Sequence, residues 1–514
     1  MTDLPQSSVG TADAPSALRV AVVVAVVFAA VLEVLDSTIV NVALPHIAAA
    51  FGAATDQTTW ILTSYMVAAV IVMPLTGLLA KRVGRRTLIL TSIVGFITFS
   101  MLCGFSWSLE TIVAFRLGQG LFGAFLIPLS QSILFDAFPR EKRGQAMALF
   151  GLGVVVAPVL GPTLGALLTD YFSWRMVFFV NLPVAALALL LLAGELPKDE
   201  PTEVRIDYWA LLWMAMGIGL LQFALDQGES ENWLSSHTIQ LAAIGSALGL
   251  VLFVIRNLRQ KYPLVDLKLF ANRNFAIANI VIAGFAVGMF GGIAILPLFV
   301  QGLLGYPVVE AGYLFIPRGL AAGFSMILVG SVLSNRIDPR LLAAIGLSLV
   351  AAGNFMMAGL NLSVDFWQLA WPGVVSGLGM GFVFVPMSTL AFDQVGSEAQ
   401  DEASGLYGVI RQLGSSIGIA IVGALLVQAI STNNAVLTSY VTPFSQAATS
   451  YLAPLGLTPV DPAGAAVIAS QISGQAQMLA YSSVFFDLGV VSLALLPLLL
   501  AMTKPVGNQK AVVV

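Results

Sequence analysis

Long, nearly uninterrupted apolar runs separated by short polar stretches dominate the pattern along this chain. A helix that crosses a lipid bilayer needs about 20 consecutive, mostly apolar residues. Fourteen stretches reach that length, and because each must satisfy its own backbone polar groups inside lipid, each predicts a helix. Continuous runs, without alternation, argue against a membrane β-barrel. The expected bounds are 18–45, 57–80, 87–107, 109–133, 144–169, 174–193, 207–226, 237–256, 273–303, 307–334, 340–360, 366–391, 403–431 and 476–502.

The composition agrees with a chain that lies in a membrane. Of the 514 residues, 58% are hydrophobic and 10% are charged, against about 45–50% and about 25% in soluble proteins. A soluble fold could not hide so much apolar surface, which excludes a soluble enzyme, a nucleic-acid binder and a disordered scaffold. A net charge of −4 leaves no basic patch for nucleic acid. We therefore expect an all-α polytopic membrane protein in contact with the lipid bilayer and with no nucleic acid.

Cysteine and histidine are too scarce to support metal or disulfide chemistry. The chain has one cysteine, Cys103, and two histidines, His46 and His237, which lie far apart in sequence. This excludes a disulfide framework and a Cys-based metal site and disfavours a metal centre, so no cofactor is expected. Without a nucleophile–base pattern a membrane-embedded enzyme is also disfavoured. No Gly-x-x-x-x-Gly-Lys-[Ser/Thr] stretch occurs, so ATP is not expected to supply the energy directly.

The basic residues predict an orientation. If the N-terminus is placed in the cytoplasm, 19 of the 23 Lys and Arg residues fall on that side, as the positive-inside rule requires. The other four are Arg116, Arg318 and Arg411 inside stretches and Arg175 at an outer edge. Both termini are therefore expected in the cytoplasm. The cytoplasmic set is Arg19, Lys81, Arg82, Arg85, Arg86, Arg140, Lys142, Arg143, Lys198, Arg205, Arg256, Arg259, Lys261, Lys268, Arg273, Arg336, Arg340, Lys504 and Lys510.

Two pairs of segments suggest an internal duplication. Residues 77–86 resemble residues 331–340 at an offset of 254, and Gly151 and Gly161 match Gly408 and Gly418 at an offset of 257. Duplicated halves around a central site are a common plan for secondary transporters. The expected organisation is an N-terminal six-helix bundle (1–194), an inserted two-helix segment with cytoplasmic linkers (195–272), and a C-terminal six-helix bundle (273–514). The last contains a long outer loop, 432–475, which is either a docking site for a partner or an unstructured loop.

Ionisable residues inside the stretches are the candidates for chemistry, because each costs about 2.5–3.5 kcal/mol at the membrane centre. Glu33 and Asp36 lie three residues apart and therefore share a helix face. Such carboxyls can bind and release protons, or serve as structural hydrogen-bonding groups. Arg116 is a candidate partner for them, either in proton coupling or as a static clamp. In the second half, Arg318, Arg411 and Asp487 are candidates for substrate binding or for structural clamping.

Several motifs together resemble the fourteen-helix drug:proton antiporters, a branch of the major facilitator superfamily, and most of all the EmrB-type exporters. Residues 35–45 resemble the first-helix signature of that branch, and residues 174–183 and 263–267 are similar to its other typical segments. Motifs A, B and C of the superfamily are resembled by residues 77–86, 116–120 and 153–165. This resemblance implies the major facilitator fold with 14 transmembrane helices, as two six-helix bundles and two inserted central helices.

The ionisable residues inside the stretches and the motif residues together give the expected site. Proton coupling falls to Glu33, Asp36 and Arg116, and substrate binding is expected of Glu33, Asp36, Asn41, Arg318, Arg411 and Asp487. Gly161 and Gly165 form a small-xxx-small face that allows a close helix contact, and Pro158 and Pro162 favour a kink. The expected gating residues are Gly77, Lys81, Arg82, Gly84, Arg85, Gly153, Pro158, Gly161, Pro162 and Gly165.

One position departs from the family pattern. Motif A usually has an acidic residue where this chain has Lys81, so the charge pairing ascribed to that acid cannot be carried over.

The expected function is a proton-coupled antiporter of the bacterial inner membrane that exports hydrophobic drugs or toxic compounds by alternating access. The alternative is a proton-coupled transporter of one specific metabolite. The resemblance further implies a periplasmic adaptor protein and an outer-membrane channel as possible partners.

Overall fold

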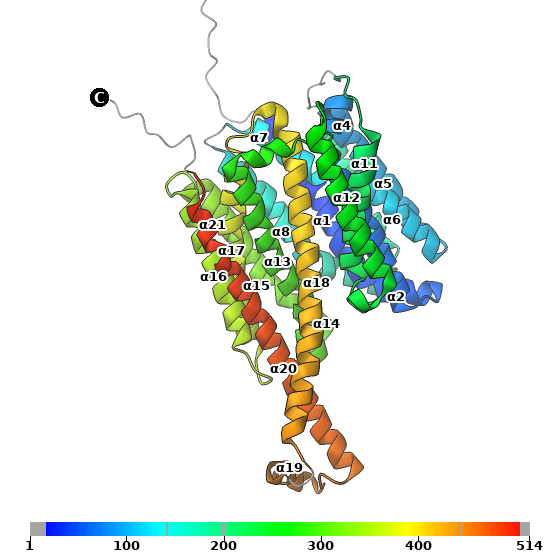
Figure 1. The fold of residues 1–514 in the computed structure, drawn as a ribbon, viewed down its shortest axis with the longest axis vertical. Helices are drawn as coiled ribbons and strands as arrows, with labels where there is room; N and C mark the ends of the chain where they lie inside the picture. The colour runs from blue at the N-terminus through cyan, green and yellow to red at the C-terminus, as the bar shows by residue number, and fades with distance from the viewer. Residues whose placement is uncertain (1–16, 140–141, 195, 197–200, 443–444, 504–514) are drawn as a thin grey trace, which may run out of the picture.

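The computed structural model describes residues 17–139, 142–194, 196, 201–442 and 445–503, and these fold almost entirely into helices (Figure 1). Thirteen helical segments within this part of the chain are long and apolar enough to cross a membrane. The fourteenth expected stretch, 144–169, is the 29-residue helix α8 (Arg143–Tyr171). The prediction of an all-α polytopic membrane fold is confirmed.

The first part of the chain forms one group of helices around α1. The helix α1 packs against α7, α8 and α10, while α3 lies against α6, and α5 against both α6 and α10. We call this set of helices the first lobe. It consists of α1 (Ala17–Phe51), α2 (Thr55–Thr58), α3 (Trp60–Val72), η1 (Met73–Leu75), α4 (Thr76–Val83), α5 (Arg85–Gly104), α6 (Leu109–Gly123), α7 (Leu126–Ala137), α8, α9 (Met176–Phe179) and α10 (Asn181–Ala193).

The last part of the chain forms a second group, which we call the second lobe. Its closest packing joins α16 to α17, α13 to α18, and α15 to α17, and α20 lies against α16 and α18. It consists of α13 (Arg273–Pro297), η5 (Leu298–Leu303), α14 (Val308–Tyr313), α15 (Phe315–Leu328), η6 (Val329–Leu333), α16 (Pro339–Ala358), α17 (Phe366–Phe392), α18 (Gln400–Tyr440), α19 (Gln446–Leu452), α20 (Pro462–Ala494) and α21 (Leu496–Leu500).

A helical pair stands between the two lobes in sequence. The helices α11 (Tyr208–Gln227) and α12 (His237–Arg259) pack on each other, and α11 also contacts α3 of the first lobe and α18 of the second. Ser246 donates a hydrogen bond of 2.8 Å to the carbonyl of Gly217, where the two helices approach closely. The inserted pair is therefore attached to the bundle through α11.

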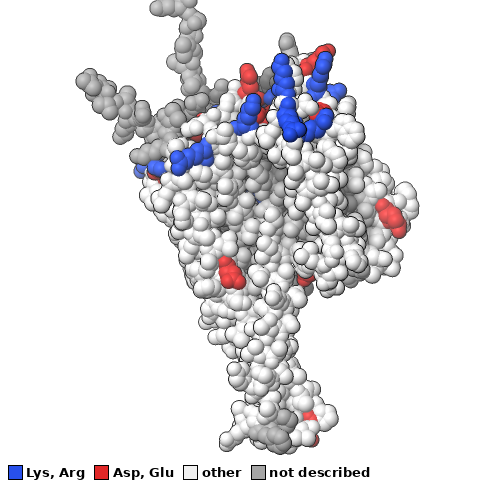
Figure 2. All heavy atoms as spheres, viewed as in Figure 1, with Lys and Arg blue, Asp and Glu red and all other residues white. Residues whose placement is uncertain are grey.

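Lys and Arg side chains gather at one end of the molecule, while the middle of the face seen in Figure 2 is almost uncharged. We call this end the basic end and the opposite one the distal end.

The lobes meet through α4 and α7 against α18, and through α8 against α15, α17 and η6. The side chain of Arg19, the residues Arg140, Lys198, Lys504 and Lys510, and both chain termini lie outside the described residues.

The expected outer loop is largely helical. The helix α18 runs through 41 residues to Tyr440, and α20 starts at Pro462, so the pair extends beyond the other helices to α19 at its tip (Figure 1). At about 1.5 Å per residue α18 is roughly 60 Å long, twice the thickness of the hydrocarbon core of a bilayer. The prediction of a loop over 432–475 was wrong because a helix that leaves the membrane can continue wherever a partner helix covers it. We call this feature the distal hairpin.

Candidate functional site

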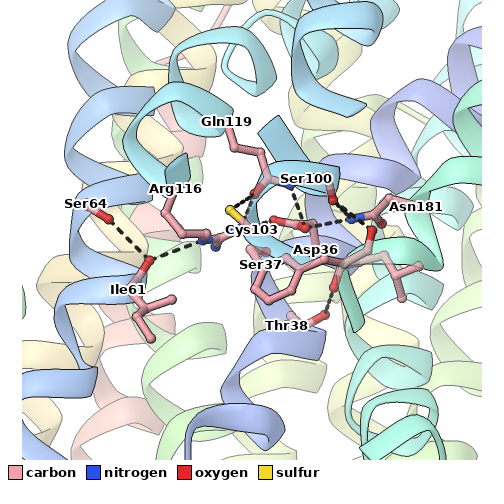
Figure 3. A network of polar contacts seen from close by, with 12 residues as sticks. Asp36, Ser37, Thr38, Ile61, Ser64, Ser100, Cys103, Arg116, Gln119 and Asn181 are labelled. Atoms are coloured by element: carbon pink, nitrogen blue, oxygen red, sulfur yellow. Dashed lines mark hydrogen bonds and ion pairs between the residues drawn. The ribbon is translucent and has the colours of Figure 1, made fainter. Parts of the chain in front are cut away.

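A buried network joins Asp36 of α1 to four other helices of the first lobe, α3, α5, α6 and α10 (Figure 3). Asp36 forms an ion pair with Arg116 of α6, and both side chains are 0% exposed. The carboxylate also accepts hydrogen bonds from the amide nitrogens of Gln119 (2.9 Å) and Asn181 (2.7 Å). The pairing of Asp36 with Arg116 that the sequence suggested is thus present, and neither residue faces lipid.

The surroundings hold the Arg116 guanidinium in a fixed position. Its Nε donates to the carbonyl of Ile61 at 3.2 Å, and one terminal nitrogen donates to the Gln119 side-chain oxygen at 2.8 Å. The guanidinium carbon lies 4.2 Å from the centre of the Tyr65 ring, a cation–π distance. Asn181 also donates to the Ser100 hydroxyl at 3.0 Å, which extends the network to α5. The other terminal nitrogen of Arg116 and the Asn181 side-chain oxygen are buried without a hydrogen-bond partner among the described residues. The charge pair is nevertheless costly to break, because each partner alone would be a buried, uncompensated charge.

Glu33 lies one helical turn from Asp36, on the same side of α1, and is 7% exposed. Pro128 accounts for the backbone N–H group that the Glu33 carboxylate binds. The proline ring disfavours a helical carbonyl at Ala124, and the chain breaks there between α6 and α7. The break leaves free N–H groups at the start of α7, which favour an anion. One of them, the N–H of Ile127, donates to the Glu33 carboxylate at 3.3 Å.

Arg411 brings a positive charge toward Glu33 from the other lobe. It lies on α18, and the charges of Glu33 and Arg411 interact electrostatically. No hydrogen bond or ion pair joins them among the described residues. Glu33 thus has a cation of the second lobe in its electrostatic surroundings, while Asp36 forms its ion pair within its own lobe.

The remaining candidates for substrate binding are dispersed. Arg318 of α15 packs its backbone against Gly377 of α17, and its Nε is buried without a hydrogen-bond partner among the described residues. Asn41 is exposed on α1, 3.4 Å from the carbonyl of Ser37. Asp487 is exposed on α20, in a groove formed only by second-lobe residues, so the structure does not bring it to Glu33 and Asp36.

The motif C residues fit α8 tightly against α1. A Cβ atom added to Gly161 would lie 2.1 Å from the Thr38 hydroxyl, and one on Gly165 would lie 2.9 Å from the carbonyl of Ile39. Gly153 similarly leaves no room beside Val27. Both prolines of the motif lie inside the single helix α8. The small residues therefore set the closest approach between α8 and the helix that carries both carboxylates, and the prolines (Pro158 and Pro162) remove two backbone donors along it.

The motif A residues make the contact between lobes at the basic end. Lys81 forms an ion pair of 3.3 Å with Glu402 in the first turn of α18, and Gly77 leaves the space into which the Glu402 backbone fits. Arg85 bonds Asp401 of α18 at 3.0 Å and also pairs with Asp136 of α7. Gly84 has a φ of +84°, which lets the chain turn between α4 and α5. Arg82 is exposed.

Sequence reasoning missed the acceptors and amides that complete these contacts. Gln119 and Asn181 lie in segments already recognised as motifs, and amides near a buried carboxylate were the available signal. Asp401 and Glu402 begin an apolar stretch, where acidic residues favour the helix N-terminus, so they carried no separate signal. Among the described residues, no group of three or more His, Cys, Asp or Glu side chains is placed to hold a metal ion.

Comparison with known proteins identifies the family. Residues 26–419 match the family model of the Major Facilitator Superfamily. The multidrug export protein EmrB of Escherichia coli (strain K12) is 35% identical over 490 residues, covering 94% of this chain and 95% of EmrB. The fatty acid resistance protein FarB of Neisseria gonorrhoeae is 34% identical over 473 residues, covering 91% and 92%.

A solved structure supports the fold alone. The human organic anion transporter MFSD10 (TETRAN) superposes with a TM-score of 0.61 at 16% identity, covering 92% of this chain and 99% of MFSD10. Both of the relatives named above are more than 30% identical to this chain and align over more than nine-tenths of it. This chain therefore belongs to the major facilitator superfamily of membrane transporters, in the family of the EmrB multidrug export proteins.

Proposed function

We propose that this protein is a proton-coupled antiporter that exports hydrophobic compounds by alternating access. Family membership supports the transport class, and the similarity to the multidrug export protein EmrB supports drug export. The observation that carries the coupling mechanism is the placement of two carboxylates, Glu33 and Asp36, on one buried face of α1.

In this mechanism Glu33 carries the exchanged proton. Asp36 accepts hydrogen bonds from an arginine and two amides, so its role in this proposal is to hold Arg116 within the first lobe. Glu33 accepts one backbone hydrogen bond of 3.3 Å, so protonation disrupts little around it. When Glu33 is neutral, Arg411 loses a favourable charge interaction across the lobe interface, which changes the balance between the two arrangements of the lobes.

The substrate binds between the lobes in this proposal. Arg318 and Arg411 supply cationic groups from the second lobe, and Glu33 and Asn41 supply polar groups from the first. Asp36, which is 0% exposed, holds the network of the first lobe and does not contact the substrate. A drug that binds next to Glu33 makes protonation of Glu33 less favourable, and protonation of Glu33 in turn displaces the drug. This competition between drug and proton is the basis of their exchange across the membrane. The membrane potential adds about 2.3 kcal/mol per charge per 100 mV to proton entry.

The motif A contacts form a gate at the basic end. Lys81 supplies a positive charge where the family has an acid, and Glu402 of α18 supplies the complementary negative charge. The polarity of the pair is thus opposite to that usual in motif A, while an ion pair between the lobes is kept. Opening the basic end requires Lys81 and Arg85 to leave Glu402 and Asp401, and the close α1–α8 contact made by motif C guides the movement.

We place the basic end in the cytoplasm of a bacterial inner membrane, as the positive-inside rule requires. The distal hairpin then stands on the outer side. Its length beyond the bilayer makes it the docking element for a periplasmic adaptor, which in turn meets an outer-membrane channel. Loss of adaptor binding after deletion of residues 440–470 would support this placement, and unchanged binding would contradict it.

The decisive experiment measures drug efflux from proteoliposomes with an imposed pH gradient. Glu33→Gln should lose acceleration by the gradient while keeping exchange of labelled for unlabelled drug, because the other groups proposed to bind the substrate remain. Asp36→Asn should reduce both activities, since the Arg116 charge is left buried without its partner. Asp170→Asn is the matched control, because Asp170 is exposed at the distal end of α8. Normal gradient-driven efflux in both Glu33→Gln and Asp36→Asn would contradict the mechanism.

A further inference from the structure

A groove of about 700 Å³ opens on the flank of the second lobe, where α16 ends. The helix α16 stops at Ala358, while the neighbouring helices α18 and α20 continue into the distal hairpin. The last turn of α16 therefore forms the floor of a recess walled by two longer helices. The lining residues are Phe355, Ala358, Gly359, Asn433, Leu479, Ser482, Ser483, Phe486 and Asp487.

Packing between α16 and α20 fixes the shape of the recess. Gly489 leaves room for the Phe355 ring, which lies 5.3 Å from the ring of Phe486. The Ser482 hydroxyl donates to the carbonyl of Ala358 and ties α20 to the end of α16. These contacts between α16 and α20 give the recess its shape.

The recess lies at the edge of the bilayer farther from the basic end. The 20 residues of α16 extend about 30 Å, the thickness of the hydrocarbon core. Since Gly489 packs on Phe355 and α20 runs antiparallel to α16, Asp487 is level with the last turn of α16. It thus lies roughly 25 Å along the helix axis from Arg340 at the basic end. A ligand in the recess can keep its polar group near the headgroups and its chain in lipid.

Asp487 has no positive partner in this region. It is the only ionisable residue between Pro462 and Leu500 apart from Tyr481, and α17 contains no charged residue. No hydrogen bond or ion pair to Asp487 is found within the described part of the chain. A carboxylate facing lipid is costly and needs a compensating group.

The other polar groups of the recess offer acceptors. The Ser483 hydroxyl donates to the carbonyl of Ala480 (2.9 Å), and the Asn433 amide nitrogen donates to the carbonyl of Ala476 (3.3 Å). The hydroxyl donors of Ser482 and Ser483 and one of the two amide hydrogens of Asn433 are thus used within the protein, while oxygen atoms remain for a ligand. A recess with one anion and several acceptors selects a ligand that is both cationic and a hydrogen-bond donor.

Below the recess an apolar strip leads into the bilayer. Phe486, Val490 and Leu493 recur at helical spacing on α20 and are exposed by 53%, 45% and 38%. We propose that this recess binds a protonated alkylamine from the bilayer, with its ammonium group on Asp487 and its chain along this strip. Phospholipid headgroups fit less well because the residues that line the recess include no Lys or Arg for a phosphate. The site is separate from Glu33 and Asp36 and does not depend on proton coupling.

The test uses a dodecylamine that carries a photoreactive diazirine, with the full-length protein in phosphatidylglycerol nanodiscs. Photolabelling of peptides covering 355–359 and 479–493 is measured by mass spectrometry. Asp487→Asn should lower labelling about tenfold, the factor expected for one charge-assisted hydrogen bond. Asp487→Glu should retain labelling, and so should the control Asp170→Asn. The corresponding photoreactive dodecanol should label these peptides no better in the wild type than in Asp487→Asn.

Three outcomes would overturn the proposal. Equal amine labelling of wild type and Asp487→Asn would remove the role of the carboxylate. Equal labelling by the amine and the alcohol would leave only an apolar surface. Loss of amine labelling when phosphatidylethanolamine replaces half of the lipid would assign the recess to a lipid headgroup.

Discussion

Replacing Arg116 by leucine leaves the Asp36 carboxylate buried inside the first lobe without its charge partner. Asp36 would keep the hydrogen bonds from Gln119 (2.9 Å) and Asn181 (2.7 Å), but neither amide brings a positive charge. Removing one member of a fully buried ion pair costs about 3–5 kcal/mol. Both side chains are 0% exposed, so this range applies without a discount for solvent.

Cys103 provides a direct assay of that loss. It is the only cysteine of the chain, is 0% exposed, and has its sulfur 3.8 Å from the Gln119 side-chain oxygen of the same network. A thiol reagent can reach it only when this part of the lobe opens, so the labelling rate under native conditions measures the opening free energy. Since about 1.4 kcal/mol corresponds to a factor of ten, Arg116→Leu should speed labelling roughly 150- to 4,000-fold.

Arg340→Leu is the matched control, because Arg340 pairs with Asp338 at 2.7 Å in a partly exposed position. An exposed pair contributes about 0–1 kcal/mol, so its loss should change Cys103 labelling by less than about fivefold. The double variant Asp36→Leu/Arg116→Leu should label more slowly than Arg116→Leu, since no buried charge is left. Equal labelling of Arg116→Leu and Arg340→Leu would refute the reasoning.

Three further outcomes are expected. Lys81→Glu should place two acids at the gate and slow transport in the proteoliposome assay, and adding Glu402→Lys should restore the rate; a double variant as slow as the single one would contradict the pairing. Gly161→Ala should lower the unfolding temperature and transport because its Cβ meets α1, whereas Gly194→Ala, with nothing within 4 Å, should change neither. Hydrogen bonds from its arginine partner on α12 and from the start of α11 lower the pKa of Asp207 from its ordinary value of 3.8. The contribution of ionised Asp207 to stability is therefore complete above the ordinary pKa and is lost as the pH falls through the lowered pKa. Asp207→Asn should accordingly reduce the difference in unfolding temperature between pH 6 and pH 3.

Hydropathy predicted the positions of the helices because the bilayer fixes their length and permits few other backbone states. It failed where that constraint ends. Residues 432–475 contain four prolines and many small or polar residues, which suggested a loop. Helix packing across the distal hairpin, a tertiary effect, keeps much of this segment helical. The break between α6 and α7 at Ala124 could not be predicted either, because hydropathy is the same for a continuous helix and for an interrupted one.

For the site, composition singled out the buried charges but could not say which of them meet. The pairing of Asp36 with Arg116 followed from motifs on two helices of one lobe. The interaction of Glu33 with Arg411 and the ion pair of Lys81 with Glu402 join residues more than 300 positions apart. Contacts at that separation depend on how the lobes meet, and a single sequence carries no measure of this. Asp487 likewise looked like a site residue until the structure placed it on the flank.

The unbroken length of α18 has a mechanical consequence. One rod carries Asp401 and Glu402 at one end, Arg411 near Glu33 along its course, and the tip of the distal hairpin at the other end. A tilt of about 10° at the lobe contact would sweep the far end by roughly 10 Å over its length. A partner bound at the tip can therefore shift the equilibrium of the ion pairs at the other end of α18. Conversely, the release of those ion pairs moves the tip.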